Sequence, residues 1–388
     1  MKIVADVNIP FVEEAFDSVG SVTTVNGRRI SADEVRDADV LLVRSVTMVD
    51  ANLLQRSKVK FVGTATIGTD HIDLEFLKGQ GIGFASAPGS NAVSAAEYVV
   101  SSILALSVEQ QINLSETTVG IVGCGNVGSR VLARAQALGM QCLVYDPPRA
   151  RQFNDREYAP WNEVVQADIV TAHVPLTFTG DYPTYQMFDS AFFRQLKANA
   201  VFINTARGRA VDETALLSVL QDRADLQLVL DVWQSEPNIN LDLLRRTNIA
   251  TSHIAGYSLD GKVRGTEMIY QAVCDYFGLQ PSWTTPVLPF SNSYTAMQFN
   301  DDQTDESVVR QSVFNAYNVM QDDARLRKIA ELDPSQRGQY FDGLRKNYPV
   351  RREFSNYEII ISQSRAHLHG VLTGLGFRVE TASGKITS

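Results

Sequence analysis

Short apolar runs alternate with amphipathic segments along the N-terminal quarter of the chain. The apolar runs are rich in β-branched residues and end in polar or glycine residues, which is the pattern of buried strands. The segments between them have helical spacing, and Ser31 with Glu34 forms the signature of a capping box. Strands that alternate with helices predict a parallel sheet covered by helices. The predicted strands are 2–7, 40–45 and 61–66, and the predicted helices are 9–19, 31–38 and 49–57.

The same alternation restarts after a long helix predicted to begin at Ala95. Five further strand candidates, separated by helical segments, predict a second α/β unit over about residues 94–256. These five candidates are 118–123, 141–146, 168–174, 200–206 and 226–232.

The composition and the pattern of apolar residues change near residue 281. The stretch 281–292 holds three prolines, which is typical of a linker. The chain beyond it is more polar, with helix-like stretches within 304–332 and a strand candidate at 357–362. A third region, separate from the two α/β units, is therefore expected.

A glycine-rich turn, GCGNVG, lies between a predicted strand and a predicted helix. Gly123 would permit the tight turn, Gly125 would let the backbone approach a pyrophosphate, and Gly128 would allow close packing of helix on strand. The helix N-terminus that follows favours an anion. By itself such a turn also fits a strand–helix connection that binds nothing.

The residues after the next strand candidate decide between these interpretations. Asp146 ends that strand, 18 residues after Gly128. A carboxylate there accepts hydrogen bonds from the ribose hydroxyls of NAD and repels the 2′-phosphate of NADP. The sequence therefore predicts an NAD site, although Arg149 and Arg151 nearby would suit NADP.

Composition and charge narrow the class of protein. A chain of 388 residues exceeds the size that one core usually supports, so two or three domains are expected. The net charge of −9 argues against a chain dedicated to nucleic acid. Three scattered cysteines favour neither a disulfide framework nor a metal site. The longest apolar run, 98–108, is too short to span a membrane, and the N-terminus lacks a signal peptide, so we expect a cytoplasmic protein.

Four candidate functional residues follow strand candidates of the second unit. Arg207 lies in NTARG, Asp231 and Glu236 lie in DVWQSEP, and His253 lies in SHIAGY. Ligands of open parallel sheets bind outside the carboxyl ends of the strands, so these side chains are expected to converge. Taken singly, each residue would more often have a structural role.

Together these residues suit hydride transfer at a carbon that bears a hydroxyl next to a carboxylate. Arg207 can clamp that carboxylate and polarise the neighbouring carbonyl. His253 can take the hydroxyl proton, and Glu236 would hold the imidazole in position. Asp231 could bind the carboxamide or ribose of the nicotinamide half.

The four motifs together resemble those of the D-isomer-specific 2-hydroxyacid dehydrogenase family, over about residues 40–280. The resemblance implies NAD as cofactor and Arg207, Glu236 and His253 as the catalytic residues. The cofactor contacts that follow from it and from the glycine turn are Gly123, Gly125, Asn126, Val127, Gly128, Asp146, Thr205, Ala206, Arg207, Asp231 and Gly256.

The predicted fold class is α/β, with two doubly wound parallel-sheet (Rossmann-like) domains and a C-terminal α+β dimerisation domain. The resemblance implies a discontinuous substrate-binding domain, 1–93 plus 257–285, and an NAD-binding Rossmann domain at 94–256. The remainder, 286–388, is the predicted dimerisation domain of a homodimer.

The substrate side is expected from the first unit. Arg44 and Ser45 end one strand candidate, and Thr64, Thr66 and Gly68 lie at and after the end of another. Backbone amides and hydroxyls there could hold a carboxylate or a sugar-acid oxygen. Arg44 is unusual after an apolar strand, and either a salt bridge or a second anionic group on the substrate would explain it.

The C-terminal segment FDGLRKNYPVRREFSNYEI resembles the tail of one branch of the family, which acts on a small phosphorylated hydroxy acid. Such a substrate has a carboxylate for Arg207 and a phosphate for Arg44. A basic cluster could help to bind the phosphate, from the same or a partner subunit, or could be an ordinary solvated face. This cluster is Arg345, Lys346, Arg351 and Arg352. The implied substrate contacts are Arg44, Ser45, Thr66 and Tyr257.

Two other functions fit the same motifs. Another dehydrogenase of the family, such as a phosphoglycerate dehydrogenase, would share the catalytic residues and differ at the Arg44 loop and the tail. An NAD-sensing interaction protein on the same fold would bind the cofactor without turnover. How tightly NADH is held, and what reoxidises it, is not encoded in any motif.

Overall fold

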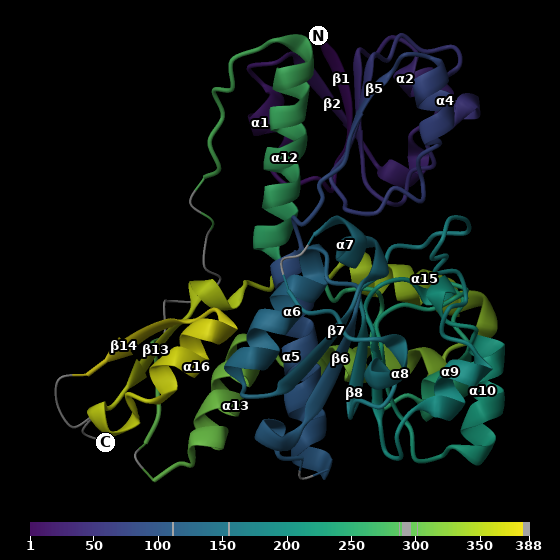
Figure 1. The fold of residues 1–388 in the computed structure, drawn as a ribbon. Coiled ribbons are helices and arrows are strands. Elements are labelled where there is room, and N and C mark those ends of the chain that lie inside the picture. The colour runs from purple at the N-terminus through teal and green to yellow at the C-terminus, as the bar shows by residue number, and fades with distance from the viewer. Residues whose placement is uncertain (111, 154–155, 287, 289–295, 301, 383–388) are drawn as a thin grey trace. The chain divides into compact units, whose positions relative to one another are not determined.

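The computed structural model describes residues 1–110, 112–153, 156–286, 288, 296–300 and 302–382 (Figure 1). The chain forms two compact units, which are Met1–Ala92 with Ser258–Ser291 and Val93–Tyr257 with Asn292–Ser388. Each unit contains a parallel sheet with helices, so the predicted α/β class is confirmed. The predicted proline-rich linker, 281–292, lies partly outside the described residues.

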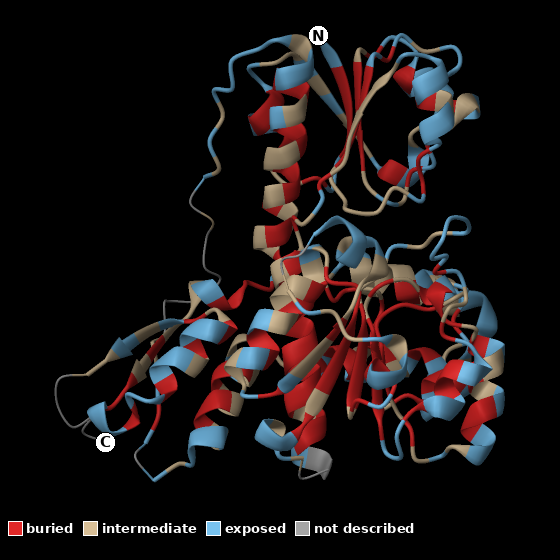
Figure 2. Ribbon diagram, in the orientation of Figure 1, coloured by how far each residue is buried: buried red, intermediate tan, exposed pale blue. Residues whose placement is uncertain are grey.

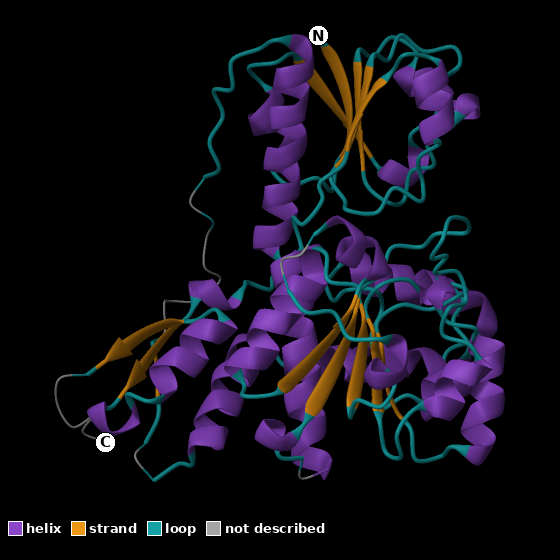
Figure 3. Ribbon diagram, viewed as in Figure 1, coloured by secondary structure: helices purple, strands orange, loops and turns teal. Residues whose placement is uncertain are grey.

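The unit that begins at Met1 is built on a five-stranded parallel sheet in the order β2-β1-β3-β4-β5, with helices on both sides (Figure 3). Phe16 and Phe61 pack with Tyr270 on one face, and Leu41 packs with Leu77 on the other. The strands are β1 (Lys2–Asp6), β2 (Ser21–Val25), β3 (Val40–Val43), β4 (Phe61–Thr64) and β5 (Gly83–Ala85). The helices are α1 (Val12–Phe16), α2 (Ala32–Val35), α3 (Ala51–Leu54), α4 (Leu74–Gly79) and α12 (Leu259–Phe277).

The predicted strands of this sheet are confirmed, and two more exist that the apolar pattern did not predict. The two additional strands, β2 and β5, form the two edges of the sheet. Neither contains a fully buried residue, because an edge strand packs on one side only. The predicted capping box is present, and Ser31 N donates to Glu34 Oε2 (2.6 Å) at the start of α2.

The second unit contains a six-stranded parallel sheet in the order β11-β10-β9-β8-β6-β7. Its central strands are buried on both faces (Figure 2), which explains why they are apolar in sequence. The strands are β6 (Thr118–Val122), β7 (Gln141–Tyr145), β8 (Ile169–Ala172), β9 (Val201–Asn204), β10 (Gln227–Leu230) and β11 (Ile249–Ala250). The helices around it are α5 (Ala92–Gln110), α6 (Asn126–Ala137), α7 (Pro147–Gln152), α8 (Trp161–Val164), α9 (Ser190–Gln195), α10 (Glu213–Asp222) and α11 (Leu241–Arg246).

The order of these strands defines where a ligand binds. The chain passes from β6 to its neighbour β7 at the edge and then returns across β6 to β8. The strand order therefore reverses between β6 and β8, and a crevice for ligands forms at such a switch point. The loops after β6, β8, β9, β10 and β11 all leave the same edge, because the strands are parallel.

The C-terminal segment is a small α/β layer within the second unit. Its three-stranded parallel sheet has the order β12-β13-β14. Its elements are β12 (Met297–Gln298), α13 (Asp305–Ala316), α14 (Val319–Arg327), α15 (Pro334–Lys346), β13 (Glu358–Ile361), α16 (Leu368–Leu375) and β14 (Arg378–Thr381). The helix-like pattern at 304–332 thus corresponds to two helices, and the strand predicted at 357–362 is β13.

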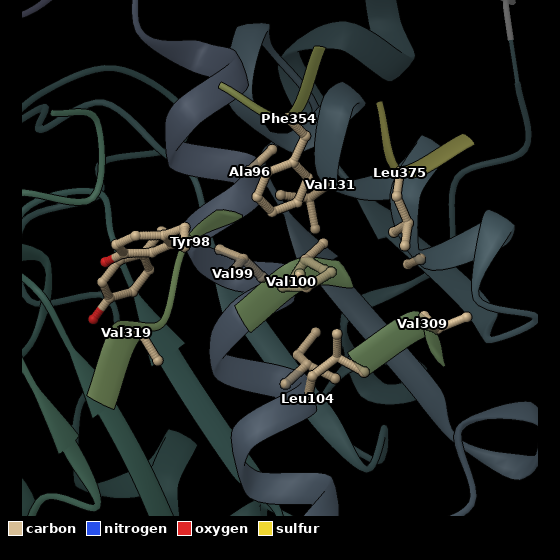
Figure 4. Packing of buried hydrophobic residues seen from close by; sticks show 14 of the residues in the cluster. Ala96, Tyr98, Val99, Val100, Leu104, Val131, Val309, Val319, Phe354 and Leu375 are labelled. Atoms are coloured by element: carbon tan, nitrogen blue, oxygen red, sulfur yellow. The ribbon is translucent and has the colours of Figure 1, made fainter. Parts of the chain in front are cut away.

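Helix α5 and the C-terminal segment share one hydrophobic core. Figure 4 shows Val100 and Leu104 of α5 close to side chains that the C-terminal segment contributes, including Val309 and Val319. Phe354 belongs to the same buried cluster. The C-terminal segment is therefore packed against the six-stranded sheet and its helices, rather than joined to them only by the chain. The assignment of 286–388 as a dimerisation domain, and the predicted domain boundaries, stay predictions.

Candidate active site

The glycine turn has the geometry that a dinucleotide requires. Gly123 has φ +87°, and a Cβ on it would lie 2.7 Å from the carbonyl oxygen of His173. A Cβ on Gly128 would lie 1.9 Å from the carbonyl oxygen of Gly123, so the helix packs directly on the turn. A Cβ on Gly125 would meet no described atom within 4 Å. The space beside Gly125, at the N-terminus of α6, is therefore open to a pyrophosphate, and these residues fit NAD.

Asp146 fastens this turn to the next strand. Its Oδ2 accepts a hydrogen bond from Cys124 N (2.7 Å), and its Oδ1 accepts one from Arg149 N (3.1 Å) at the start of α7. The carboxylate thus lies beside the glycine turn, where the sequence places a ribose acceptor. Arg151 forms an ion pair with Asp181 (2.6 Å), so its charge is already paired.

Arg207 leaves the end of β9 in a loop that Asn204 shapes from both sides. Asn204 Nδ2 donates to the carbonyl oxygen of Arg207 (3.0 Å), and Asn204 Oδ1 accepts from Ala206 N (3.0 Å). A Cβ on Gly208 would lie 2.0 Å from the backbone of Trp233, so the Arg207 loop touches the loop that carries Glu236. The glycine of NTARG is therefore required by this backbone contact.

Glu236 and His253 form the predicted pair. Glu236 Oε2 lies 2.7 Å from His253 Nδ1, and Glu236 Oε1 accepts from Trp233 N (2.8 Å). His253 has φ +58°, a strained conformation that is common at functional sites, and its side chain is 37% exposed. Burial tends to raise the pKa of Glu236, but the charge and hydrogen bond of His253 outweigh burial, together with Trp233 N–H and the charge of Arg345. The pKa of Glu236 is therefore lowered, and the carboxylate stays charged beside the imidazole.

Asp231 holds the backbone that carries His253. Its Oδ1 accepts from Thr251 Oγ1 (2.6 Å) and Ile254 N (2.7 Å), and its Oδ2 accepts from Ala255 N (2.9 Å). The residue is buried, and burial raises the pKa of its carboxyl group. Because hydrogen bonds engage both oxygens, Asp231 orients the histidine loop; its predicted contact with the cofactor stays a prediction.

One residue near this edge, His173, was missed by the sequence argument. His173 follows β8, and its Nε2 lies 2.9 Å from Thr171 Oγ1 while its Nδ1 lies 3.3 Å from Thr205 Oγ1. Burial lowers the pKa of His173 to about 3, so the ring is neutral. A polar residue directly after an apolar strand is the signal that could have found it.

The basic run of the tail does not form one cluster. Arg351 is buried and donates to the carbonyl oxygens of Ala255 (3.1 Å) and Ser94 (2.7 Å). Arg352 is also buried and donates to Asn356 Oδ1 (2.7 Å), whereas Lys346 is exposed. The expectation of four cations that act together on a phosphate, or of a common solvated face, is therefore wrong, because two of them are structural.

The predicted substrate residues Arg44, Ser45 and Thr66 lie in the unit that begins at Met1. Thr64 Oγ1 lies 2.8 Å from Thr66 Oγ1 and 3.0 Å from His71 Nε2, which fixes the loop after β4. Tyr257 lies in the other unit, four residues after His253, and packs edge-on against Tyr348 (5.6 Å). Gly256 accepts a hydrogen bond from Ser94 Oγ (3.3 Å).

Neither a membrane helix nor a metal centre is found in the part of the chain that the structure describes. No helix there is long and apolar enough to cross a bilayer. No group of at least three His, Cys, Asp or Glu side chains there could hold a metal ion.

Residues 91–255 match the family described as D-isomer specific 2-hydroxyacid dehydrogenase, NAD binding domain. A 3-phosphoglycerate dehydrogenase from Entamoeba histolytica, solved with NAD⁺ bound, superposes with a TM-score of 0.62 at 25% identity. That match covers 72% of this chain and 95% of the other. A D-lactate dehydrogenase from Aquifex aeolicus, complexed with NAD and lactic acid, gives 0.60 at 25% identity, over 72% and 96%. Fold and site thus define an NAD-dependent oxidoreductase of the D-2-hydroxyacid dehydrogenase class.

Full-length relatives narrow this class. The erythronate-4-phosphate dehydrogenase of Marinobacter nauticus is 45% identical over 98% of this chain and 100% of its own length. That of Escherichia coli K12 is 44% identical over 97% of this chain and 98% of its own. Residues 288–376 also match a domain of unknown function. The chain belongs to the erythronate-4-phosphate dehydrogenases of the D-isomer specific 2-hydroxyacid dehydrogenase family.

Proposed function

We propose that the protein oxidises 4-phospho-D-erythronate to 3-hydroxy-2-oxo-4-phosphobutanoate with NAD, as a step of pyridoxal 5′-phosphate biosynthesis. The observation that carries this proposal is the Glu236–His253 pair (2.7 Å), which lies on the histidine loop held by Asp231. The relatives of full length that share this fold carry the corresponding name. NAD, when bound, supplies the acceptor for the hydride.

Arg207, His253 and Glu236 have different roles in the proposed reaction. Arg207 binds the substrate carboxylate and draws electron density from the carbon that becomes a carbonyl. His253 accepts the hydroxyl proton at Nε2, because Nδ1 faces Glu236. Glu236 keeps its charge and stabilises the imidazolium that forms. Its second oxygen is fixed by Trp233 N, so the pair is oriented before substrate arrives.

The cofactor and substrate residues that sequence reasoning named complete the proposal. The backbone of Gly125, Asn126, Val127 and Gly128 would hold the pyrophosphate. Arg44, Ser45, Thr66 and Tyr257 are the proposed substrate contacts. No ion pair of Arg44 is found in the described part of the chain, which supports an anionic ligand over a salt bridge as the reason for this residue.

The proposal includes a homodimer formed through the C-terminal segment and a location in the cytoplasm. Three cysteines without disulfides suit that reducing compartment. Sedimentation of the purified chain tests the dimer directly.

The test of the activity is the rate of NAD reduction with three substrates. We expect 4-phospho-D-erythronate to have a far higher kcat/KM than 3-phosphoglycerate or D-lactate. A clear preference for 3-phosphoglycerate would overturn the substrate assignment and leave the reaction class intact.

The variant His253→Ala distinguishes an enzyme from an NAD sensor. His253→Ala should lower kcat about 10²- to 10⁴-fold, the usual contribution of general acid–base catalysis. Its affinity for NADH, measured by fluorescence titration, should stay within about threefold, because the imidazole is not needed to hold the pyrophosphate. A wild-type protein that binds NADH and turns over none of the three substrates would instead support a sensor.

A further inference from the structure

Helix α15 of the C-terminal segment packs on the loop that carries Glu236. A Cβ on Gly338 would lie 2.8 Å from Asn238 Oδ1 and 3.4 Å from Pro237 Cγ. Arg345 follows Gly338 on α15 by two helical turns, so both residues lie on the same face of the helix. The segment outside the NAD-binding domain match therefore directs one cation at the catalytic loops.

The guanidinium of Arg345 lies beside the two loops of the catalytic unit. Its Cζ is 5.9 Å from the ring centroid of Tyr257, and Tyr257 and the carboxylate of Glu236 favour its charged form against the effect of burial. Tyr257 is packed edge-on by Tyr348, whose hydroxyl donates to Asp322 Oδ2 (2.7 Å). The position of the aromatic ring next to Arg345 is therefore fixed by the same C-terminal segment.

Arg345 has one buried donor that no protein group in the described part of the chain satisfies. Its Nε is buried without a hydrogen-bond acceptor among the described residues. The rest of the guanidinium interacts with the hydroxyl of Tyr257 and with the carboxylates of Glu236 and Asp342. The nearest catalytic carboxylate, Glu236, is already paired with His253. A buried donor without an acceptor is costly, and an oxygen of a ligand anion would remove that cost.

The neighbouring cations of the tail behave differently. Arg351 donates to two backbone carbonyls, pairs with Glu97 (3.6 Å) and stacks over Tyr317 (3.5 Å from Cζ to the ring centroid). Arg352 is bonded to Asn356, and Lys346 points into solvent. Nε of Arg351 also lacks a partner among the residues that the structure describes, but that side chain is held by Glu97 and two carbonyls, whereas Arg345 combines an unfilled donor with proximity to Glu236.

We propose that Arg345, with Tyr257, binds the phosphate end of the substrate, so that the C-terminal segment determines specificity for a phosphorylated acid. This inference rests on the proposed function. Arg207 would hold the carboxylate at one end of the substrate, and the fork of Arg345 would bind phosphate oxygens at the other, with the reacting carbon at His253 between them. A guanidinium offers several parallel donors to a phosphate, which an ammonium does not.

The test compares substrates with and without the phosphate. In Arg345→Gln, kcat/KM for 4-phospho-D-erythronate should fall about 10- to 100-fold, the usual effect of losing a charge-assisted hydrogen bond. For D-erythronate, kcat/KM or the inhibition constant should change less than about twofold, because this molecule lacks the phosphate that Arg345 would bind. Arg345→Lys should lie between, since it keeps the charge and loses the fork.

Lys346→Gln is the matched control, because it removes the same charge from the adjacent, exposed position. It should leave both constants unchanged. An equal loss on both substrates in Arg345→Gln would mean that Arg345 acts through Glu236, and no loss on either would mean that it binds nothing; both results overturn the proposal.

Failure of the proposed function would be visible separately. If the wild-type protein reduces no NAD with 4-phospho-D-erythronate, the proposed activity is wrong. Calorimetry with inorganic phosphate then tests whether Arg345 binds an anion. Binding that weakens at least about tenfold in Arg345→Gln would support the anion site. Equal binding by both proteins would overturn it.

Discussion

Oε2 of Glu236 lies 2.7 Å from Nδ1 of His253, and the other carboxylate oxygen is fixed by the backbone N–H of Trp233. Glu236 is therefore oriented by a backbone donor on one side and orients the imidazole on the other. The remaining imidazole nitrogen is the one that would accept the substrate's proton in the proposed mechanism, and substitutions around the pair can test this.

Replacing Glu236 with glutamine keeps an acceptor for His253 and removes the charge. We expect kcat to fall about 10- to 100-fold, less than in His253→Ala, because the imidazolium loses a charge-assisted partner. NADH affinity should not change. A variant with full kcat would show that the pair only positions the loop.

Alanine at Gly125 tests the cofactor site without disturbing the fold. Gly125 has φ −77° and ψ −141°, and a Cβ there would meet no described atom, so the free energy of unfolding should fall by no more than about 1 kcal/mol. The methyl group would occupy the space assigned to the pyrophosphate, and the Kd for NADH should rise at least about tenfold.

Gly128→Ala is the contrasting variant for that experiment. Its Cβ would lie 1.9 Å from the carbonyl oxygen of Gly123, so it should lower the free energy of unfolding. Unchanged NADH affinity in Gly125→Ala would place the cofactor elsewhere.

Asp231→Asn tests the role of this residue in holding the histidine loop. Asparagine has one acceptor oxygen, so it can keep Thr251 and Ile254 but would turn an N–H group toward Ala255 N. We expect the free energy of unfolding to fall by about 1–3 kcal/mol, with a lower kcat. Urea titration and initial rates would measure the two effects. Loss of NADH binding with unchanged stability would instead support a direct cofactor role.

Glu97 on α5 gives stability a defined pH dependence. Burial raises the pKa of Glu97 to about 8, against the opposing charges of Arg351 and Arg134. The protonated form is favoured in the folded state. The contribution of Glu97 to the free energy of unfolding is therefore complete below pH 4.5, the ordinary pKa of glutamate, and is lost as the pH rises toward about 8.

Glu97→Gln imitates the protonated form and keeps the acceptor for Phe354 N. The free energy of unfolding of this variant, from urea titrations at several pH values, should fall less steeply than that of the wild type across this range. The same slope in both proteins would show that Glu97 stays ionised in the folded protein.

Much of the second unit and of its candidate active site could be predicted, because local sequence patterns encode them. The strands β6 to β10 are apolar runs of the right length, and the glycine turn with Asp146 identifies the nucleotide edge. Arg207, Glu236 and His253 follow successive strands, and parallel strands deliver their ends to one edge. The edge strands β2 and β5 were not predicted, because one-sided packing leaves them without a continuous apolar run.

The sequence by itself determined the reaction class, the cofactor and the residues of the Glu236–His253 pair, because these depend on residue type and on order along parallel strands. The tertiary structure alone decided which of the tail's cations are structural and which is directed at the catalytic loops. Arg345 and Arg351 are both arginines in one basic run, yet the first lies beside Tyr257 and the second is bonded to the carbonyls of Ser94 and Ala255. Only the packing of α15 on the Glu236 loop separates them, since that contact joins residues about a hundred positions apart in the chain.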